Sequence, residues 1–317
     1  MKTLTAEIKQ RATELGFSKV GIARAEHLSE EGERLNEWLA RGFQATMEWV
    51  SRNAEKRVDP RKVLPDARSV IVVALNYYTD FRHSTEEGTG RVSRYAWGDD
   101  YHDILGEKLA ELLEFIKLKL PQVHGKVYVD TGPVMEKAWA QRAGIGWIGK
   151  HTNLITQDYG SWVFLGELII NVEFEYDDPA TDHCGSCTLC VEACPTEAIV
   201  EPYVLDSNRC ISYLTIEHRG EIAEELGERF DRWVYGCDIC QDVCPWNQRF
   251  SHPTIVEEFR PRAQTLAPSL AEWSEMSPKE FSENFSRSSM KRTKRSGLTR
   301  NAKLLLSSTT SGTRIDN

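Results

Sequence analysis

The hydrophobic pattern of the first 175 residues includes two stretches with the helical period. Apolar positions recur three and four residues apart over 4–15 and 103–120, and a helix breaker (Gly16 and Pro121) follows each stretch. The side chains of such stretches form one apolar face. The pattern therefore predicts two amphipathic helices that cover a sheet.

Short apolar runs between and after these helices predict the strands. The runs cover residues 17–25, 69–78, 125–130, 152–156 and 161–172. The second, SVIVVALNYY, is apolar enough to be a central strand. Pro133 stands where the first turn of another helix, over 133–143, would begin. Strands that alternate with helices predict an N-terminal α/β or α+β domain.

The remaining composition is that of an ordinary soluble protein. The chain has 317 residues, 40% hydrophobic and 27% charged, which is enough for two domains with real cores. No apolar stretch approaches the roughly 18 residues that span a bilayer. The N-terminus is already amphipathic and lacks the apolar region of a signal peptide. We therefore expect a cytoplasmic protein that has no membrane partner.

Charge is distributed unevenly. The net charge is −9, but residues 284–315 contain eight of the 39 basic residues and no acidic one. Residues 1–283 then carry 31 basic against 47 acidic residues, a net charge of −16. A basic segment on an acidic body fits a polyanion that docks locally. A solvated tail is the commoner alternative.

All eight cysteines lie between positions 184 and 244. A disulfide framework would spread its bridges through the fold, so this clustering indicates metal. The run CGSCTLCVEACP (184–195) has the spacing of a bacterial ferredoxin, in which three cysteines bind one 4Fe–4S cluster and the fourth binds the other. Paired C-x2-C also binds zinc, but zinc gives no reason for the interlaced three-plus-one spacing.

The second run, CDICQDVCP (237–245), lacks its leading cysteine. Cys210 is the only cysteine left to complete it. The spacing predicts two clusters, the first bound by Cys184, Cys187, Cys190 and Cys244, and the second by Cys210, Cys237, Cys240 and Cys194. The 26 residues 211–236 are then an insertion, which is either a surface loop or one wall of a site beside the cluster. Its start, ISYLTIEH, is too apolar for a solvated loop.

The N-terminal domain offers weaker signals. Gly144, Gly146 and Gly149 match a dinucleotide fingerprint, but a helix precedes them and a strand follows, which excludes a nicotinamide site. They either let backbone approach a flat ligand or form a helix exit. Asp130 follows a strand and can be a proton donor there, although spacing alone favours a turn or cap. His102 is by the same reasoning a residue of a helix start.

Several stretches together resemble the epoxyqueuosine reductase family. They are EKRVDPRKVLPDARSVIVVALNYY, RYAWGDDYHD, VDTGPVMEKAWAQRAGIGWIGKHTNLI, CGSCTLCVEACPTEAI, RCISYLTIEHRG and YGCDICQDVCPWN, in order over residues 1–250, with a weaker continuation in RSGLTRNA. The displaced Cys210 with ISYLTIE is a hallmark of that family.

The resemblance implies a fold, a reaction and two kinds of cofactor. The fold would be α+β: a cobalamin-binding α/β domain like those of nitroreductases and reductive dehalogenases over 1–178, a ferredoxin-like domain with two 4Fe–4S clusters over 179–250, and a basic segment over 251–317. Family members remove the epoxide oxygen from epoxyqueuosine at the wobble position of tRNA. The corrin ring would lie between the domains, with no side-chain ligand from below.

The resemblance also implies roles for particular residues. Asp130 becomes the proton donor, and the glycines at 144–149 become backbone beside the cofactor. The cobalamin neighbours would be Arg57, Asp130, Leu154, Leu165, Leu168, Ser212 and Asp238. The tRNA contacts would be Arg219, Lys291, Arg292, Arg295 and Arg300. We further expect a monomer that takes electrons from a flavodoxin- or ferredoxin-type donor.

One departure and three alternatives accompany this resemblance. Many family members continue into helical repeats, whereas this chain stops after KLLLSSTTSGTRIDN (303–317), a Ser/Thr-rich tail without helical periodicity that we expect to be disordered. RNA affinity would then be lower than in the family. The alternatives are a non-catalytic electron carrier, a corrinoid reductase acting on a small molecule such as an organohalide, and a zinc-binding adaptor.

Overall fold

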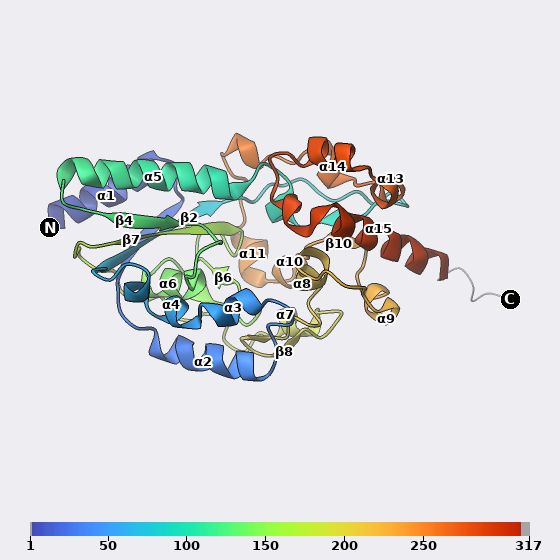
Figure 1. Ribbon diagram of the computed structural model, residues 1–317, viewed down its shortest axis with the longest axis horizontal. Helices are drawn as coiled ribbons and strands as arrows, with labels where there is room; N and C mark the ends of the chain where they lie inside the picture. The colour runs from blue at the N-terminus through green and yellow to red at the C-terminus, as the bar shows by residue number, and fades with distance from the viewer. Residues whose placement is uncertain (1, 312–317) are drawn as a thin grey trace.

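A four-stranded antiparallel sheet organises the first half of the chain (Figure 1), as seen in a computed structural model that describes residues 2–311. The strand order is β1 (Lys19–Arg24), β2 (Ser69–Asn76), β7 (Val163–Ile170) and β4 (Gly125–Tyr128), and every neighbouring pair is antiparallel. All eight residues of β2 are buried, which confirms the prediction of a central strand. The antiparallel sheet makes the domain α+β.

Each face of the sheet is covered by helices, as Figure 1 shows. On one face, Ile71 and Val73 of β2 join the core beneath α1 (Lys2–Glu14) and α5 (Tyr101–Lys119). On the other face, the alternate residues Val70 and Val72 join a core with α6 (Glu136–Arg142) and Leu28, the residue before α2 (Ser29–Ala40). Alternate side chains of a strand point to opposite faces, so a run of apolar residues is the expected sequence of β2.

The cysteine runs fold into short elements beside the sheet domain. They are α7 (Leu189–Glu192), β8 (Ile199–Glu201), β9 (Val204–Leu205), α10 (Ile239–Asp242) and α11 (Pro245–Phe250). The hairpin of β5 (Trp147–Ile148) and β6 (Leu154–Ile155) leads toward them from α6. Between β1 and β2 lie α2, α3 (Glu48–Arg52), α4 (Ala54–Val58) and the 3-10 turn η1 (Pro60–Lys62).

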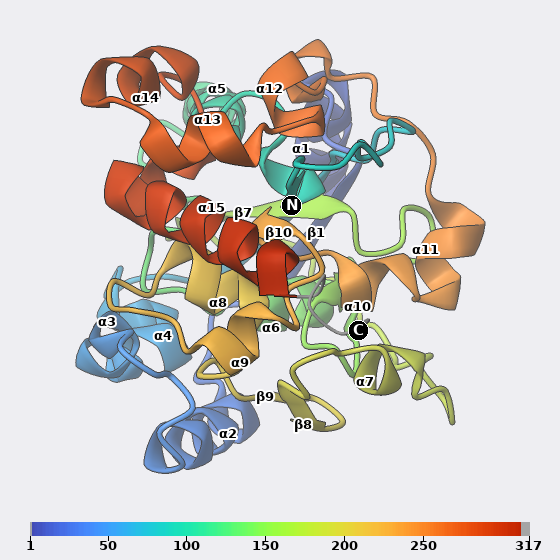
Figure 2. The same cartoon turned by 90° about the vertical axis from the view of Figure 1, so that its right-hand side faces the viewer.

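The insertion after Cys210 is part of a second core. It contains α8 (Ile211–Ile216), α9 (Glu224–Gly227) and β10 (Trp233–Tyr235), and β10 pairs in parallel with β3 (Arg91–Val92) just before the turn η2 (Arg94–Ala96). The C-terminal segment covers it, with α15 lying along β10 and α8 in Figure 2. This segment comprises η3 (Glu257–Phe259), α12 (Ala263–Leu266), α13 (Leu270–Glu275), α14 (Pro278–Asn284), η4 (Ser289–Thr293) and α15 (Lys294–Ser311).

The C-terminal helix corrects one prediction. Residues 303–311, expected to be disordered, continue α15, and the remaining residues of the predicted tail, 312–317, lie outside the described part of the chain. Leu298, Ala302 and Leu305 are almost fully buried in the second core. Leu305 belongs to the predicted tail, so the expectation of disorder was wrong for residues 303–311, which form a helix packed on this core.

Packing does not follow the predicted boundaries at 178 and 250. The second core contains Val92 from the first predicted segment, Trp233 from the second and Leu298 from the third. The domain boundaries at 178 and 250 therefore stay a prediction, and the second core contains residues from all three predicted segments. No helix within residues 2–311 is long and apolar enough to cross a membrane.

Candidate functional site

Asp130 lies on the loop that follows β4 and has a left-handed backbone, with φ +55°. Its side chain is 59% exposed. The backbone N–H of Asp130 donates a hydrogen bond to Oε1 of Glu136, at 2.5 Å. Left-handed backbone is unfavourable for a residue with a side chain, so this loop needs such a contact to stay in place.

His102 at the start of α5 faces this carboxylate. Asp100, the N-cap of the helix, accepts bonds from the His102 N–H (3.1 Å) and from Nδ1 (2.6 Å), while Nε2 lies 3.3 Å from Oδ2 of Asp130. Burial alone would lower the pKa of His102, but the hydrogen bonds to the two carboxylates outweigh it and raise this pKa to about 9. His102 is thus both a helix-start residue, as predicted, and the partner of Asp130.

The charge of Asp130 is set by the groups around it. Burial would raise the pKa of its carboxyl, but hydrogen bonds from His102 and Tyr101, the positive charge of His102 and that of Arg292 lower it. The proton of the His102–Asp130 pair therefore resides on the imidazole at neutral pH. An imidazolium against a carboxylate can deliver one proton to a group that approaches Asp130.

The structure brings the second predicted set of cysteines together around one cavity. The residues of this set that line it are Cys194, Cys210, Cys237 and Cys240. The cavity is also lined by Lys137, His151 and Thr152 of the sheet domain and by Ser212 of the insertion. Burial, and then the charges of neighbouring thiolates, hold the pKa of Cys240 well above its usual value. This displaced cysteine set thus lies where the insertion meets the sheet domain.

The first predicted set is grouped around Cys190 of α7. Burial and then the thiolates of Cys244, Cys184 and Cys187 raise the pKa of Cys190 to about 11. Cys244 is buried beside Trp147, with Cys184 packed against them. Within the described residues, no group of three or more His, Cys, Asp or Glu side chains could hold a single metal ion. The assignment of particular cysteines as cluster ligands stays a prediction. The geometry groups the thiols in the same two sets.

The residues predicted to surround cobalamin are placed unequally. Ser212 lines the cavity, and Leu154 and Leu165 are nearly buried in the core with α6. Leu168 has no exposed surface and packs on the opposite face of the sheet, toward α5, which removes it from the candidate cofactor site. Arg57 lies near Asp130 and Glu136, and its buried Nε has no hydrogen-bond partner among the described residues.

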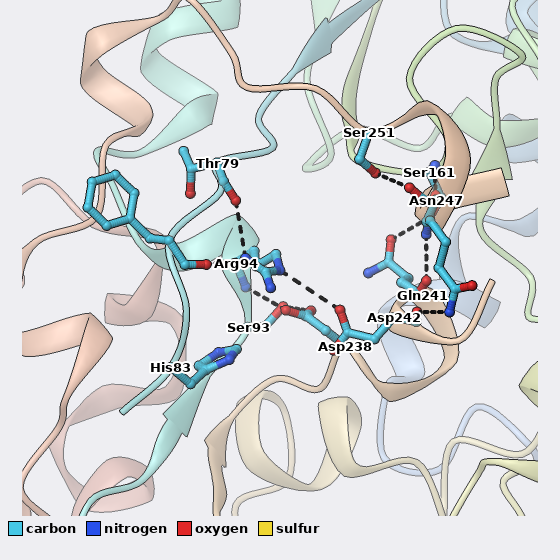
Figure 3. Close-up of polar contacts among 12 residues, drawn as sticks. Thr79, His83, Ser93, Arg94, Ser161, Asp238, Gln241, Asp242, Asn247 and Ser251 are labelled. Atoms are coloured by element: carbon cyan, nitrogen blue, oxygen red, sulfur yellow. Dashed lines mark hydrogen bonds and ion pairs between the residues drawn. The ribbon is translucent and has the colours of Figure 1, made fainter. Parts of the chain in front are cut away.

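Asp238 is also fully buried, at 0% exposure, so it offers no atom to a ligand. Figure 3 shows its contacts: its carboxylate accepts bonds from the Ser93 hydroxyl (2.5 Å) and the Arg94 backbone N–H (2.8 Å). Burial, and then the charge of Asp242, raise the pKa of Asp238 to about 7. Its role in the structure is to fix α10, which follows Cys237, against η2.

A second part of the same network joins α11 to the sheet domain (Figure 3). The amide of Asn247 donates to Ser161 Oγ at 2.8 Å, the Ser161 N–H donates back to Asn247 Oδ1 at 2.6 Å, and the Ser161 hydroxyl donates to Gln241. All three side chains are buried, and buried polar groups that satisfy one another fix one arrangement. The cluster-bearing elements are therefore held rigidly against the sheet domain.

The glycines at 144–149 serve protein packing. A Cβ on Gly146 would lie 2.2 Å from the Ile155 carbonyl oxygen, and one on Gly144, with φ +72°, would lie 2.7 Å from that of Asp178. These contacts explain the glycines without a ligand. They form a close joint after α6, which is the helix-exit alternative, and their place beside the cofactor stays a prediction.

The five predicted tRNA residues fall into two groups. Arg219 and Arg300 are engaged with backbone carbonyls, and Arg300 donates to those of Leu214, His218 and Gly220. Arg295 donates to the Met276 carbonyl, and Arg292 pairs with Glu217 through two nitrogens. Lys291 is exposed on η4, near Asp100. Of these five residues, the structure therefore favours Lys291 as the contact for a phosphate group of tRNA.

Sequence reasoning missed two acidic residues beside Asp130. Glu136 begins α6, and Glu167 lies in the middle of β7 with no exposed surface. Glu136 belongs to one of the stretches that carry the family resemblance, and Glu167 belongs to a stretch that the hydrophobic pattern assigns to a strand. A single acidic residue inside the apolar run WVFLGELII is the signal that could have singled out Glu167, because a buried acid needs a reason.

Comparison with known proteins decides the family. The family model described as epoxyqueuosine reductase QueG, DUF1730, matches residues 57–131, and the 4Fe–4S double cluster binding domain matches residues 183–247. The epoxyqueuosine reductase of Cellulophaga algicola is 47% identical over 298 residues, covering 94% of this chain and 96% of the relative. The chain belongs to the epoxyqueuosine reductase family. It is therefore an oxidoreductase of that family with a 4Fe–4S double cluster domain.

Other relatives agree with this epoxyqueuosine reductase assignment. The epoxyqueuosine reductase of Synechocystis is 50% identical, covering 86% of this chain and 94% of its own. A crystal structure of epoxyqueuosine reductase with an epoxyqueuosine-modified tRNA-Tyr stem loop superposes with TM-score 0.88 at 37% identity, over 96% of this chain and 81% of that one. These matches confirm the predicted family, and they exclude the zinc adaptor and the simple electron carrier.

Two further solved structures are similar to this chain. The Bacillus subtilis epoxyqueuosine reductase, whose structure has a catalytic aspartate loop swung out of the active site, superposes with TM-score 0.90 at 35% identity, over 96% of this chain and 82% of that one. A catabolic reductive dehalogenase superposes with TM-score 0.52 at 17% identity over 95% of this chain and 38% of its own, which confirms the predicted shared fold alone.

Proposed function

We propose that this enzyme reduces epoxyqueuosine to queuosine at the wobble position of tRNA, using cobalamin and electrons from two 4Fe–4S clusters, with Asp130 delivering a proton. The observation that carries the proposal is the His102–Asp130 pair, whose exposed carboxylate lies near Lys137, a residue that lines the cavity with the second cysteine set. Removing an epoxide oxygen as water consumes two electrons and two protons. The pair supplies one proton and solvent the other.

Buried polar atoms beside Asp130 and at the cavity are available to a polar cofactor. Arg57 Nε and His151 Nε2 are buried atoms that lack a hydrogen-bond partner among residues 2–311, and such atoms are rare unless a ligand satisfies them. Ser212 and Lys137 line the cavity between these elements and the second cysteine set. We infer that these four residues hold cobalamin, whose amide groups can bond them. When bound, cobalamin supplies a strongly reducing cobalt centre for breaking the C–O bond.

The protein's own contribution is to hold and move a proton and to orient the base. His102 keeps the proton until the epoxide oxygen approaches, and Asp130 passes it on at Oδ2. Asp100 fixes the imidazole by binding Nδ1, so that Nε2 is the nitrogen that faces Asp130. The buried hydrogen bonds around Ser161 and Asp238 keep the cluster-bearing elements in contact with this domain while electrons pass.

His102 gives this proposal a pH signature. With the pKa of His102 at about 9, the pair keeps its proton through neutral pH and loses it as pH rises through about 9. In His102→Gln, the carboxyl of Asp130 loses its cationic partner and must hold the proton alone, and a carboxyl group has a far lower pKa than the imidazole of His102. The alkaline limb of the kcat–pH profile should therefore shift by several pH units toward acid.

The measurement is kcat with a chemical reductant from about pH 5 to pH 10, on wild type, on His102→Gln and on His124→Gln as a control. His124 is exposed beside Asp66 and precedes β4, whereas Asp130 follows the other end of that strand. An unchanged limb in His102→Gln would place the proton elsewhere.

We also propose that the substrate tRNA reaches this site across η4. Lys291 is exposed beside Asp100, and Arg292 contributes positive charge to Asp130. Phosphate contacts by lysine release counterions, so Lys291→Ala should weaken tRNA binding and reduce the slope of log K against log salt by about one. The matched control is Lys279→Ala, an exposed lysine of α14. Equal binding of both variants would remove η4 from the path.

The experiment that tests the whole proposal is anaerobic turnover of an epoxyqueuosine-containing anticodon stem loop, with and without added cobalamin, read by mass spectrometry. Loss of one oxygen only with cobalamin is expected. No loss with both clusters intact would contradict the proposal, and loss without cobalamin would contradict the cofactor. The same assay, run with a flavodoxin or a ferredoxin in place of the chemical reductant, identifies the kind of electron donor.

A further inference from the structure

Glu167 is an acidic residue in the middle of the most buried part of the sheet. It lies opposite Val72 on β2 and Tyr128 on β4, so strands flank it on both sides. Leu165 and Ile169, two positions before and after it, belong to the core on the α6 face, and Glu167 points the same way because strand side chains alternate. Its side chain is 0% exposed.

Neither carboxyl oxygen of Glu167 has a hydrogen-bond donor within residues 2–311. The polar group that reaches it is the carboxyl of Glu136, at the start of α6. Two carboxylates can only accept hydrogen bonds, so the two groups can bond each other only if one of them is protonated. Two negative charges close together in an apolar site repel each other strongly. A pair of carboxyl groups there therefore retains one proton.

The surroundings set which group keeps the proton. Burial, and then the charge of Glu136, hold the pKa of Glu167 well above its usual range. Burial, and then the charge of Asp130, raise the pKa of Glu136 to about 7, while Lys137 and the Asp130 N–H act in the other direction. Glu136 is thus the member that more readily carries the negative charge, which the guanidinium of Arg57 also faces.

The charged member holds the loop of Asp130. Oε1 of Glu136 accepts the backbone N–H of Asp130 at 2.5 Å, and this bond fixes the residue whose φ is +55°. A carboxylate is a stronger acceptor for a backbone N–H than a neutral carboxyl group. The side chain of Asp130 is meanwhile directed to His102, with Tyr101 and Arg292 also acting on it.

We propose that Glu136 and Glu167 share one proton, and that this pair positions Asp130 for proton transfer. Glu167 carries the proton and donates it in a hydrogen bond to the Glu136 carboxylate, which in turn accepts the Asp130 N–H. The inference rests on the proposed role of Asp130 as proton donor. It assigns a use to a buried acid whose oxygens have no hydrogen-bond donor among the described residues.

Two substitutions at Glu167 separate the shared proton from simple packing. In Glu167→Gln, the amide still donates to Glu136, and we expect kcat within about twofold of wild type. In Glu167→Leu, the donor is gone, Glu136 loses its partner and the loop loosens. Misplacing a reacting group by about an ångström can cost a hundredfold, so we expect kcat to fall tenfold or more with KM for tRNA unchanged.

The matched control for both substitutions is at Glu173, an exposed residue three positions beyond β7. Glu173→Gln and Glu173→Leu should both turn over at the wild-type rate. Wild-type turnover of Glu167→Leu would overturn the proposal. Equal losses in Glu167→Leu and Glu167→Gln would overturn it as well, because the amide should rescue.

An infrared measurement tests the shared proton without relying on turnover. At neutral pH in D2O, the wild-type holoenzyme should show a carbonyl band of a protonated carboxyl group that Glu167→Gln lacks and Glu173→Gln keeps. Absence of such a band from wild type, or its persistence in Glu167→Gln, would overturn the proposal. This result stands even if Glu167→Leu fails to fold.

The outcome is distinguishable from failure of the proposed function. If Asp130→Asn turned over normally, Asp130 would not be the donor, and the infrared band would still report on the glutamate pair. If Asp130→Asn were inactive while Glu167→Leu was fully active, Asp130 would keep its role and the glutamate pair would lose its own.

Discussion

Asp130→Asn is expected to lose about a hundredfold or more in kcat while it keeps both clusters and its affinity for cobalamin. General acid catalysis by a positioned side chain typically contributes a factor of about 10² to 10⁴. Asparagine keeps the size of the side chain and can still face His102, but its amide cannot pass a proton on. The loop should keep its place, because the Asp130 contact to Glu136 is made by the backbone N–H.

The measurement is single-turnover deoxygenation of the modified stem loop, with iron content and cobalamin binding determined on the same preparation. Asp103→Asn is the control, because Asp103 is an exposed acid in the first turn of α5, one position after His102. Wild-type turnover by Asp130→Asn would return Asp130 to the role of a turn residue.

Cys210→Ser should remove one cluster and nearly all turnover. Cys210 precedes α8 and lines the cavity with the other three thiols of its set. Serine is a poorer ligand for iron than a thiolate, so we expect iron to fall from about eight to about four per chain. If this cluster adjoins cobalamin, the enzyme also loses its path for electrons, and turnover falls to background.

Iron analysis and electron paramagnetic resonance of the reduced protein check this result, since one cluster signal should remain. Arg209→Ser is the control, an exposed change at the preceding position. Unchanged iron in Cys210→Ser would mean that the eighth ligand lies elsewhere in the chain.

The cysteine sets were predictable because their chemistry is local. Spacing of two, two and three residues wraps a short backbone around a cluster, so Cys184 to Cys194 carry their meaning within eleven positions. Cys210 required only elimination. The strands were predictable for a similar reason, since a wholly apolar run such as 70–75 is typical of a strand buried on both faces.

The partners of Asp130 were not predictable from the sequence. His102 and Glu136 approach it only because α5 and α6 start at the same end of the sheet, and Glu167 joins them through the register that places it opposite Tyr128. Such contacts depend on strand pairing over long separations, which no local pattern encodes. The helix over 303–311 was missed because its apolar positions are few and acquire meaning only against β10 and α13.

The second core has a consequence for the order of events during synthesis. It packs Val92 and Trp233 against Leu298 and Leu305, and Leu305 lies only a few positions before the last described residue. Both cysteine runs leave the ribosome well before α15 does, so the wall behind Cys210 is still open when all eight thiols are already outside the exit tunnel. A nascent chain in which α15 has not yet formed therefore lacks the helix that covers α8 and β10, and the thiols of the second set are then more exposed to oxygen.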